Sequence, residues 1–205
     1  APRMPGRQIR EYFLKGGGVP AFIDVVQNKT GLALERLLSL SKAAGFTRAG
    51  VFQVDYKIET ELDLFIEQFL VASIVKVIHT SFDVLGNKLG YPAIQALMEL
   101  YASGELAEVL KLAANAGIGK VFQKNASPTC QYGIAANFDY VIGSDIAEKA
   151  MQIVEKIKNG TFAKELDKEG KIGYPTVRKL WEIVDTKNLN EAHTLINKLF
   201  RWREF

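Results

Sequence analysis

The hydrophobic pattern of the chain is dominated by one long segment, residues 62–89. Apolar residues there fall on nearly every side of a 3.6-residue period, which predicts a long helix buried in a domain core or a subunit interface. Four carboxylates stand at the start of this segment: Glu59, Glu61, Asp63 and Glu67. Acids beside so apolar a helix need a physical reason.

Upstream of this segment, the pattern predicts a small α/β portion. Apolar runs at 19–26 and 51–54 are typical of strands, and a leucine-rich helix is expected between them at 30–44. Gly45 is expected to close that helix as its C-terminal cap. Two strands and one helix bury too little apolar surface to be stable alone, so this portion needs a partner.

Downstream, the pattern is helical throughout. Apolar spacing, prolines near first helical positions and glycine stops predict helices at 93–102, 105–116, 145–158, 162–168, 175–184 and 189–202. We therefore expect a mainly α protein.

Composition narrows the class of protein. At 205 residues and 48% hydrophobic content, the chain is long enough for one good-sized core. Its 26 basic and 23 acidic residues form no long block of one sign, so neither nucleic acid nor a membrane surface is an expected partner. The longest uncharged stretch of the long helix, residues 68–75, is far short of the ~20 residues that a bilayer span needs.

The single cysteine and the first residue carry smaller expectations. Cys130 cannot form an intrachain disulfide, which indicates a reducing cytoplasm. The chain opens at Ala1 rather than at a methionine, as expected after methionine removal or an internal cut.

Asp63 and Glu67 are the first candidates for chemistry. They are four residues apart, which stacks them on one helical face with a like-charge repulsion of about 0.2–0.5 kcal/mol. A shared cation would turn this repulsion into attraction. The alternative is that these acids complement the dipole of a helix that begins at Glu59 or Thr60.

The string Asp63-Leu64-Phe65-x-Glu67-Gln68, with residues 49–51, Lys57 and residues 59–61 before it, resembles one family. It is similar to the segment of ketol-acid reductoisomerases in which the nicotinamide-binding domain passes into the helical domain. The last strands of that family's nucleotide-binding domain also resemble four segments of this chain, in the same order and at similar spacing: residues 1–6, 9–10, 16–20 and 47–51.

This resemblance implies two domains. Residues 1–57 correspond to the C-terminal part of a Rossmann-type domain, and residues 58–205 to a knotted helical domain of the 6-phosphogluconate-dehydrogenase C-terminal type. The chain has no G-x-G-x-x-G motif after a strand, so the NADPH-binding loop belongs to a part that is absent, as does the family's catalytic histidine. His79 and His193 are expected to be structural.

The resemblance also implies a metal site. In the family, the Asp and Glu of this string hold two magnesium ions, which makes Asp63 and Glu67 metal ligands here, with Asp63 bridging. Glu99, expected in a largely buried helix, matches the first of two glutamates that the other subunit supplies. Ser103 stands where the family has the second glutamate, and Glu105 is out of phase for that face. One magnesium ion could still bind with water completing its shell, whereas two are in doubt.

A loop further along carries the substrate-binding candidate. Residues 127–133 resemble the family's S-x-T-A-E-Y-G loop, whose serine contacts the substrate carboxylate, so Ser127 is expected to bind substrate. Gln131 replaces the family's glutamate. Without the resemblance, Ser127 is a helix cap or turn residue. Cys130 has no histidine near in sequence and is expected to be a small structural residue.

Together these expectations describe the metal- and substrate-binding portion of a ketol-acid reductoisomerase. In the family, magnesium polarises a 2-hydroxy-2-acyl acid such as acetolactate, an alkyl group migrates and NADPH then delivers hydride, in branched-chain amino acid biosynthesis. Asp63, Glu67 and Glu99 would be catalytic as Mg²⁺ ligands in a homodimer with shared active sites. This chain alone is expected to be inactive without the NADPH-binding half. The alternatives are a non-catalytic dimerisation module, which Ser103 and Gln131 would permit, and a reductase of the same superfamily that acts on another acid.

Overall fold

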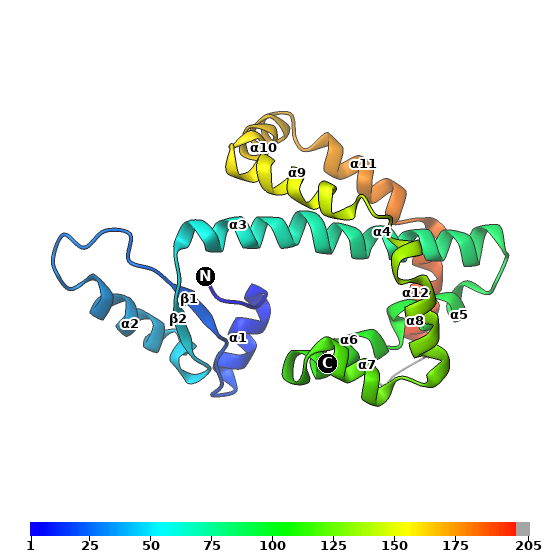
Figure 1. Cartoon of the computed structure of the whole chain (residues 1–205), viewed down its shortest axis with the longest axis horizontal. Helices are drawn as coiled ribbons and strands as arrows, with labels where there is room; N and C mark the ends of the chain where they lie inside the picture. Colours follow the sequence, from blue (N-terminus) through cyan, green and yellow to red (C-terminus); the bar gives the residue numbers. More distant parts are fainter. Residues whose placement is uncertain (200–205) are drawn as a thin grey trace. The chain divides into compact units, whose positions relative to one another are not determined.

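The computed structural model describes residues 1–199, and the chain divides into two compact units, Ala1–Ile66 and a second that begins at Glu67. Figure 1 shows strands in the first unit only, and the second is built from helices. The domain boundary predicted between residues 57 and 58 stays a prediction.

The first unit contains the strand–helix–strand element that the sequence predicts. Strand β1 (Ala21–Ile23) pairs in parallel with β2 (Val51–Gln53), and helix α2 (Ala33–Ala43) lies between them in the chain. Parallel neighbours require such a crossover connection. Both strands are shorter than the apolar runs that predicted them. The unit also contains α1 (Gly6–Leu14), the short 3₁₀ helix η1 (Phe46–Arg48) and α3 (Tyr56–Ile66).

The first three residues lie along the other side of β1. Pro2 forms an antiparallel bridge with Ala21, the Ala1 ammonium donates to the Phe22 carbonyl at 2.8 Å, and Arg3 donates its N–H to the Pro20 carbonyl at 2.9 Å. These backbone bonds fix the position from which the Arg3 side chain starts.

The glycine triplet at 16–18 is a packing element. A Cβ atom at Gly18 would lie 2.2 Å from the Gly45 carbonyl oxygen, so only glycine fits the close approach of these two backbones. Arg48 donates to the Gly17 carbonyl at 3.0 Å and stacks over the Phe13 ring at 5.0 Å. The triplet therefore joins α1 to the loop after α2.

The long helix extends from Tyr56 to Lys88, six residues earlier than expected at its start. In the second unit it consists of the π-helical turn η2 (Glu67–Val71), α4 (Ala72–Phe82) and a second π-helical turn, η3 (Asp83–Lys88). The rest of this unit comprises α5 (Ala93–Leu97), the π-helical η4 (Met98–Ala102), α6 (Glu105–Ala116), α7 (Ile118–Asn125), α8 (Pro128–Val141), α9 (Ile146–Lys158), α10 (Thr161–Lys171), α11 (Pro175–Val184) and α12 (Lys187–Leu199). The mainly α fold with a small α/β portion before it is confirmed.

The core of the second unit is small and is formed where α5 packs on α12. Leu97 and Ile196 are fully buried there, beside Phe82 of α4. At its edge, the Tyr101 hydroxyl and the His193 imidazole share a hydrogen bond. His193 is a packing residue, as expected. The helix predicted to reach Trp202 is described to Leu199, and its remaining residues lie outside the described part.

The long helix differs from expectation in its burial. Its apolar 18-residue window has a mean hydropathy of 1.5, yet 6% of that window is buried inside the chain. By length and composition it could cross a membrane, but the core helix of a soluble protein passes the same test, so one such helix is weak evidence. The predicted burial in a core does not occur within this chain alone. Burial in a subunit interface, the other environment expected for this helix, stays a prediction.

Candidate metal and substrate site

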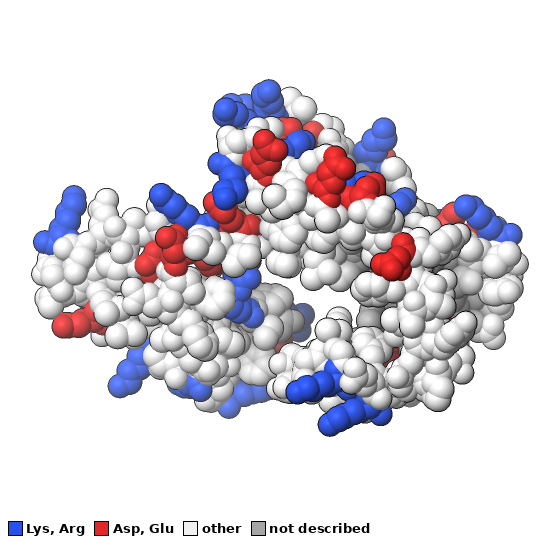
Figure 2. Space-filling view, viewed as in Figure 1, with Lys and Arg blue, Asp and Glu red and all other residues white. Residues whose placement is uncertain are grey.

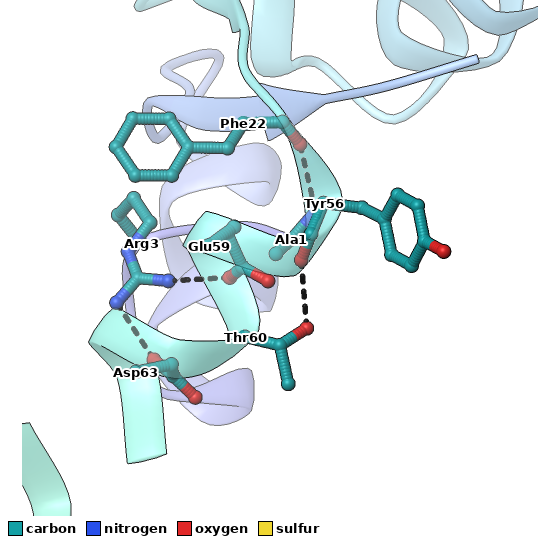
Figure 3. A network of polar contacts seen from close by, with 7 residues as sticks. All are labelled: Ala1, Arg3, Phe22, Tyr56, Glu59, Thr60 and Asp63. Atoms are coloured by element: carbon teal, nitrogen blue, oxygen red, sulfur yellow. Dashed lines mark hydrogen bonds and ion pairs between the residues drawn. The ribbon is translucent and has the colours of Figure 1, made fainter. Parts of the chain in front are cut away.

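A polar network gathers three charged side chains in the first unit (Figure 3). Arg3 places one guanidinium nitrogen, Nη1, 2.9 Å from Glu59 Oε1 and the other, Nη2, 2.7 Å from Asp63 Oδ1. The same guanidinium lies over the Phe22 ring, 5.3 Å from its centroid. The exposed fractions of the side chains are 34% for Arg3, 16% for Glu59 and 45% for Asp63, so water screens the Asp63 pair more than the Glu59 pair.

The start of α3 places the two acids on one side of the helix. Asp55 Oδ1 accepts the N–H groups of Lys57 at 2.7 Å and Ile58 at 3.4 Å, while Asp24 Oδ2 accepts the Tyr56 N–H at 3.0 Å. These carboxylates cap the first turn. The helix therefore begins before Glu59 and Thr60, which was the predicted start.

This earlier start separates the roles of the acids. Glu59 lies in the first turn and complements the helix dipole there. Asp63 follows Tyr56 by seven positions, beyond the single turn over which the dipole acts. The dipole explanation accounts for Glu59 but not for Asp63 or Glu67.

Asp63 and Glu67 differ in their surroundings. Asp63 has its Oδ1 engaged by Arg3, and its Oδ2 accepts no hydrogen bond from the described residues. Glu67 is the first residue of the second unit, is exposed, and makes no ion pair within residues 1–199. The spacing on the sequence could suggest both acids but not the arginine, because Arg3 is sixty positions away from Asp63.

Glu99 lies on an exposed face, contrary to the expectation of a largely buried position. Ala96 and Leu97 are buried in the core, whereas Glu99, in the π-helical η4, is exposed. No cavity wall surrounds it, so its charge carries little desolvation cost within the chain. Ser103, where the family has its second glutamate, accepts the Glu105 N–H at 3.3 Å at the start of α6.

Ser127 is the N-cap of α8. Its hydroxyl oxygen accepts the Cys130 N–H at 3.2 Å, and Pro128 occupies the first helical turn. The cap explanation is thus correct as a description of the local structure, and it leaves the serine exposed. Cys130 is a free, exposed thiol in the same turn.

Gln131 has a structural contact that a glutamate could not make. Its side-chain amide donates to the Ala126 carbonyl at 2.8 Å and to the Gln123 carbonyl at 3.4 Å. A carboxylate accepts hydrogen bonds only. The replacement of the family's glutamate therefore ties the loop before α8 to the end of α7.

These residues suit a divalent cation but do not enclose one within the described part of the chain. Residues 1–199 contain no group of three His, Cys, Asp or Glu side chains placed to hold a metal ion. The oxygen donors of Asp63, Glu67 and Glu99 are those that Mg²⁺ prefers, and the two glutamates are exposed and available. The donor set fits magnesium in chemistry.

One polar group that the sequence did not single out lies close by in the second unit. The side-chain nitrogen of Gln68 is buried and has no hydrogen-bond partner among the described residues. It lines a groove of about 430 Å³ with Phe69, Lys76, Ile142 and Ile153. A buried donor without a partner costs stability.

Comparisons with known proteins match nearly the whole chain. The family description "Ketol-acid reductoisomerase, C-terminal domain" matches residues 56–202, and "Acetohydroxy acid isomeroreductase, NADPH-binding domain" matches residues 1–50. Similar curated proteins are the ketol-acid reductoisomerases (NADP(+)) of Sulfurisphaera tokodaii, 40% identical over 86% of this chain and 52% of that protein, and of Saccharolobus islandicus, 38% identical over 97% and 59%.

A solved structure agrees with these matches. The NADH-preferring ketol-acid reductoisomerase from an uncultured archean superposes with a TM-score of 0.86 at 32% identity, over 98% of this chain and 60% of that one. The chain thus spans between 52% and 60% of the length of these relatives. It belongs to the ketol-acid reductoisomerase family and comprises the helical C-terminal domain preceded by part of the NADPH-binding domain.

Proposed function

We propose that this chain is the metal- and substrate-binding portion of a ketol-acid reductoisomerase that acts on a 2-hydroxy-2-acyl acid such as acetolactate, in branched-chain amino acid biosynthesis. The observation that carries the proposal is the pair Asp63 and Glu67, four positions apart on the long helix within the residues matched by the family's C-terminal domain. Both acids lie beyond the reach of the helix dipole, and the Arg3 ion pair engages one oxygen of Asp63 alone. Asp63 Oδ2 and the exposed Glu67 carboxylate therefore stay available as oxygen donors for a cation.

Three carboxylates are proposed as ligands. Asp63 and Glu67 would come from one subunit and Glu99 from its partner, with water completing the octahedron around Mg²⁺. Bound magnesium supplies a Lewis acid for the two neighbouring substrate oxygens on which charge builds during alkyl migration.

Ser127 is proposed to orient the substrate carboxylate. Because its oxygen accepts the Cys130 N–H, its own O–H remains free to donate. The N-terminus of α8 adds a partial positive charge at the same place, which favours an anion. The cap and the substrate contact are thus compatible roles for one hydroxyl.

We propose a homodimer with shared sites. Several large apolar side chains of the long helix are exposed, among them Leu70, Val71, Ile74 and Val77, and α8 exposes Tyr132, Phe138 and Tyr140. Figure 2 shows broad uncharged areas between scattered basic and acidic side chains. Surfaces of this kind are typical of protein interfaces rather than of monomers. A monomer by light scattering would contradict the dimer, and Ile74→Lys is expected to lower the measured mass.

The nucleotide is proposed to be NADPH, bound by the part of the domain that precedes these residues in the family. No residue of this chain is assigned to it. The archaeal structural relative is named as NADH-preferring, so the choice between the two nucleotides must be measured on the protein with that part present. We expect no reduction by the 205-residue chain alone. A cytoplasmic location remains a prediction from the single cysteine.

Calorimetric titration of the purified chain with Mg²⁺ tests the metal site. We expect binding that Asp63→Asn abolishes and that Asp167→Asn leaves unchanged, because Asp167 is an exposed carboxylate paired with Lys171 far from the site in sequence. With the NADPH-binding part supplied, isomerisation of acetolactate should follow the same pattern.

A dimerisation module without chemistry is the second candidate. Two observations favour it: Ser103 removes one carboxylate from the expected set, and Gln131 uses its amide for a structural contact. Dimerisation with no magnesium binding at millimolar concentration would select this candidate. Turnover of another acid by the completed enzyme would select the related reductase.

A further inference from the structure

Arg3 holds two carboxylates at once, and only one of them is a proposed metal ligand. Its two terminal nitrogens lie 2.9 Å from Glu59 and 2.7 Å from Asp63 (Figure 3). The planar guanidinium suits this fork, because each nitrogen can serve a different acceptor.

The position of Arg3 does not depend on Asp63. Its backbone N–H is bonded to the Pro20 carbonyl at 2.9 Å, and its guanidinium rests 5.3 Å from the Phe22 ring centroid. Glu59, the less exposed of the two acids, remains as a partner if the Asp63 bond breaks. The guanidinium can therefore release Asp63 without losing its place.

A cation at Asp63 would conflict with this arrangement. Arg3 and Mg²⁺ compete for the same carboxylate, and their charges repel at short range. Without the arginine, Asp63 and Glu59, four positions apart on α3, would repel each other when no metal is bound.

We infer that Arg3 is an exchangeable counter-ion of Asp63, which occupies the carboxylate in the absence of a divalent cation and transfers to Glu59 alone when one binds. This inference rests on the proposed metal site. Arg3 is a positioning residue in this role and lowers the affinity for magnesium, so that the site is neutralised when empty and releases its ion readily.

Magnesium titrations of single variants of the full chain at fixed ionic strength test the exchange. Arg3→Gln removes the competitor and is expected to tighten Mg²⁺ binding about fivefold, the ratio that corresponds to a strong exposed ion pair. Glu59→Gln removes the alternative partner, holds Arg3 on Asp63, and is expected to weaken binding about threefold. Arg3→Lys keeps the charge and should restore an affinity near that of the original chain.

Arg7→Gln is the matched control. Arg7 forms an exposed pair with Glu11 at 2.8 Å in the same unit, so its loss changes net charge equally and should leave the affinity unchanged. Melting of each variant in EDTA checks that the fold is intact. If Arg3→Gln does not fold, the weaker binding expected for Glu59→Gln and the nearly unchanged affinity expected for Arg3→Lys still decide.

The outcomes separate the counter-ion from the metal site. Weaker binding by Arg3→Gln with an intact fold would overturn the inference and leave the metal site standing. Magnesium binding by Arg3→Gln, with no binding by the original chain, would support the counter-ion inference in its strongest form. This holds if the double variant Arg3→Gln/Asp63→Asn binds no magnesium. Absence of binding in every variant would refute the metal site and this inference with it.

Discussion

The Tyr101 hydroxyl lies 2.5 Å from His193 Nε2, and this bond joins the π-helical turn η4 to the last described helix across 92 positions of the chain. The two rings also contact each other, with centroids 5.4 Å apart. Tyr101 packs against the small core around Leu97 and Ile196, and His193 directly follows Ala192, a member of that core. We expect this contact to be a determinant of stability in the second unit.

Tyr101→Phe removes the hydroxyl and leaves the ring. The free energy of unfolding should fall by about 1 kcal/mol, since the hydrogen bond between the hydroxyl and the part-buried imidazole is lost. Denaturant unfolding measures this, and a double-mutant cycle with His193→Phe should give a coupling energy of about 0.5–1.5 kcal/mol. Tyr132→Phe, at a side chain that is 76% exposed, is the control and should change nothing.

Gln68→Met should stabilise the chain. The buried amide nitrogen of Gln68 has no partner among the described residues, and a methionine of similar length fills the same space without a donor to desolvate. We expect a gain of about 1 kcal/mol in the free energy of unfolding. Gln152→Met serves for comparison, because the Gln152 amide is exposed and bonded to Glu148 at 3.2 Å. A loss of stability in Gln68→Met alone would indicate a water or ligand at the amide.

Acid should weaken the junction after α4. The Asn87 amide, 3.1 Å from Asp83 Oδ1, and then Lys88 hold the pKa of the Asp83 carboxyl below its ordinary value of 3.8. A pKa lowered by folding stabilises the folded state above the unfolded pKa, and that contribution is lost as the pH falls through the folded pKa. Unfolding free energies measured from pH 6 down to pH 3 should therefore fall less in Asp83→Asn than in the original chain. An identical acid limb in both proteins would contradict this role.

Gly18→Ala should destabilise the first unit. The added Cβ would lie 2.2 Å from the Gly45 carbonyl oxygen and 3.1 Å from Arg48 Cβ, so two backbones must move apart, at a cost of about 1–3 kcal/mol. Gly6→Ala is the matched control, because nothing lies within 4 Å of a Cβ at Gly6. Thermal unfolding followed by circular dichroism distinguishes the two variants. Equal melting temperatures would mean that the loop around Gly45 moves to accommodate the added methyl group.

Local signals in the sequence predicted much of the fold. Helices 105–116 and 175–184 were predicted to the residue, because Gly104 and Gly117 bound the first and Pro175 begins the second. Helices α1 and α7 were not predicted, and of α8 only a loop or a helix start at residues 127–129 was expected. Helices α1 and α7 are short and follow a proline or a glycine, and the few apolar residues in each, although at helical spacing, span too little sequence to distinguish a helix from a turn.

The site was predictable only where it depends on spacing along one helix. Asp63 and Glu67 could be placed together from their separation of four positions, and Ser127 could be given its cap role from the proline that follows it. Arg3 could not be linked to Asp63 from the sequence, because pairing along β1 brings it to α3 and no local pattern encodes that pairing. The burial expected for Glu99 was wrong because apolar neighbours in sequence, Ala96 and Leu97, turn toward a different side.

The π-helical turns explain why the long helix reads as apolar on all sides. A turn closed by an i to i+5 bond holds one more residue than an α-helical turn, so it advances the phase of every side chain after it. Across η2 (Glu67–Val71) the apolar positions of α4 are therefore rotated about the axis relative to a count at 3.6 residues per turn. A helical wheel drawn without that offset spreads the apolar residues over the whole circumference. A separate wheel that begins at Ala72 gives the side-chain positions of α4 correctly.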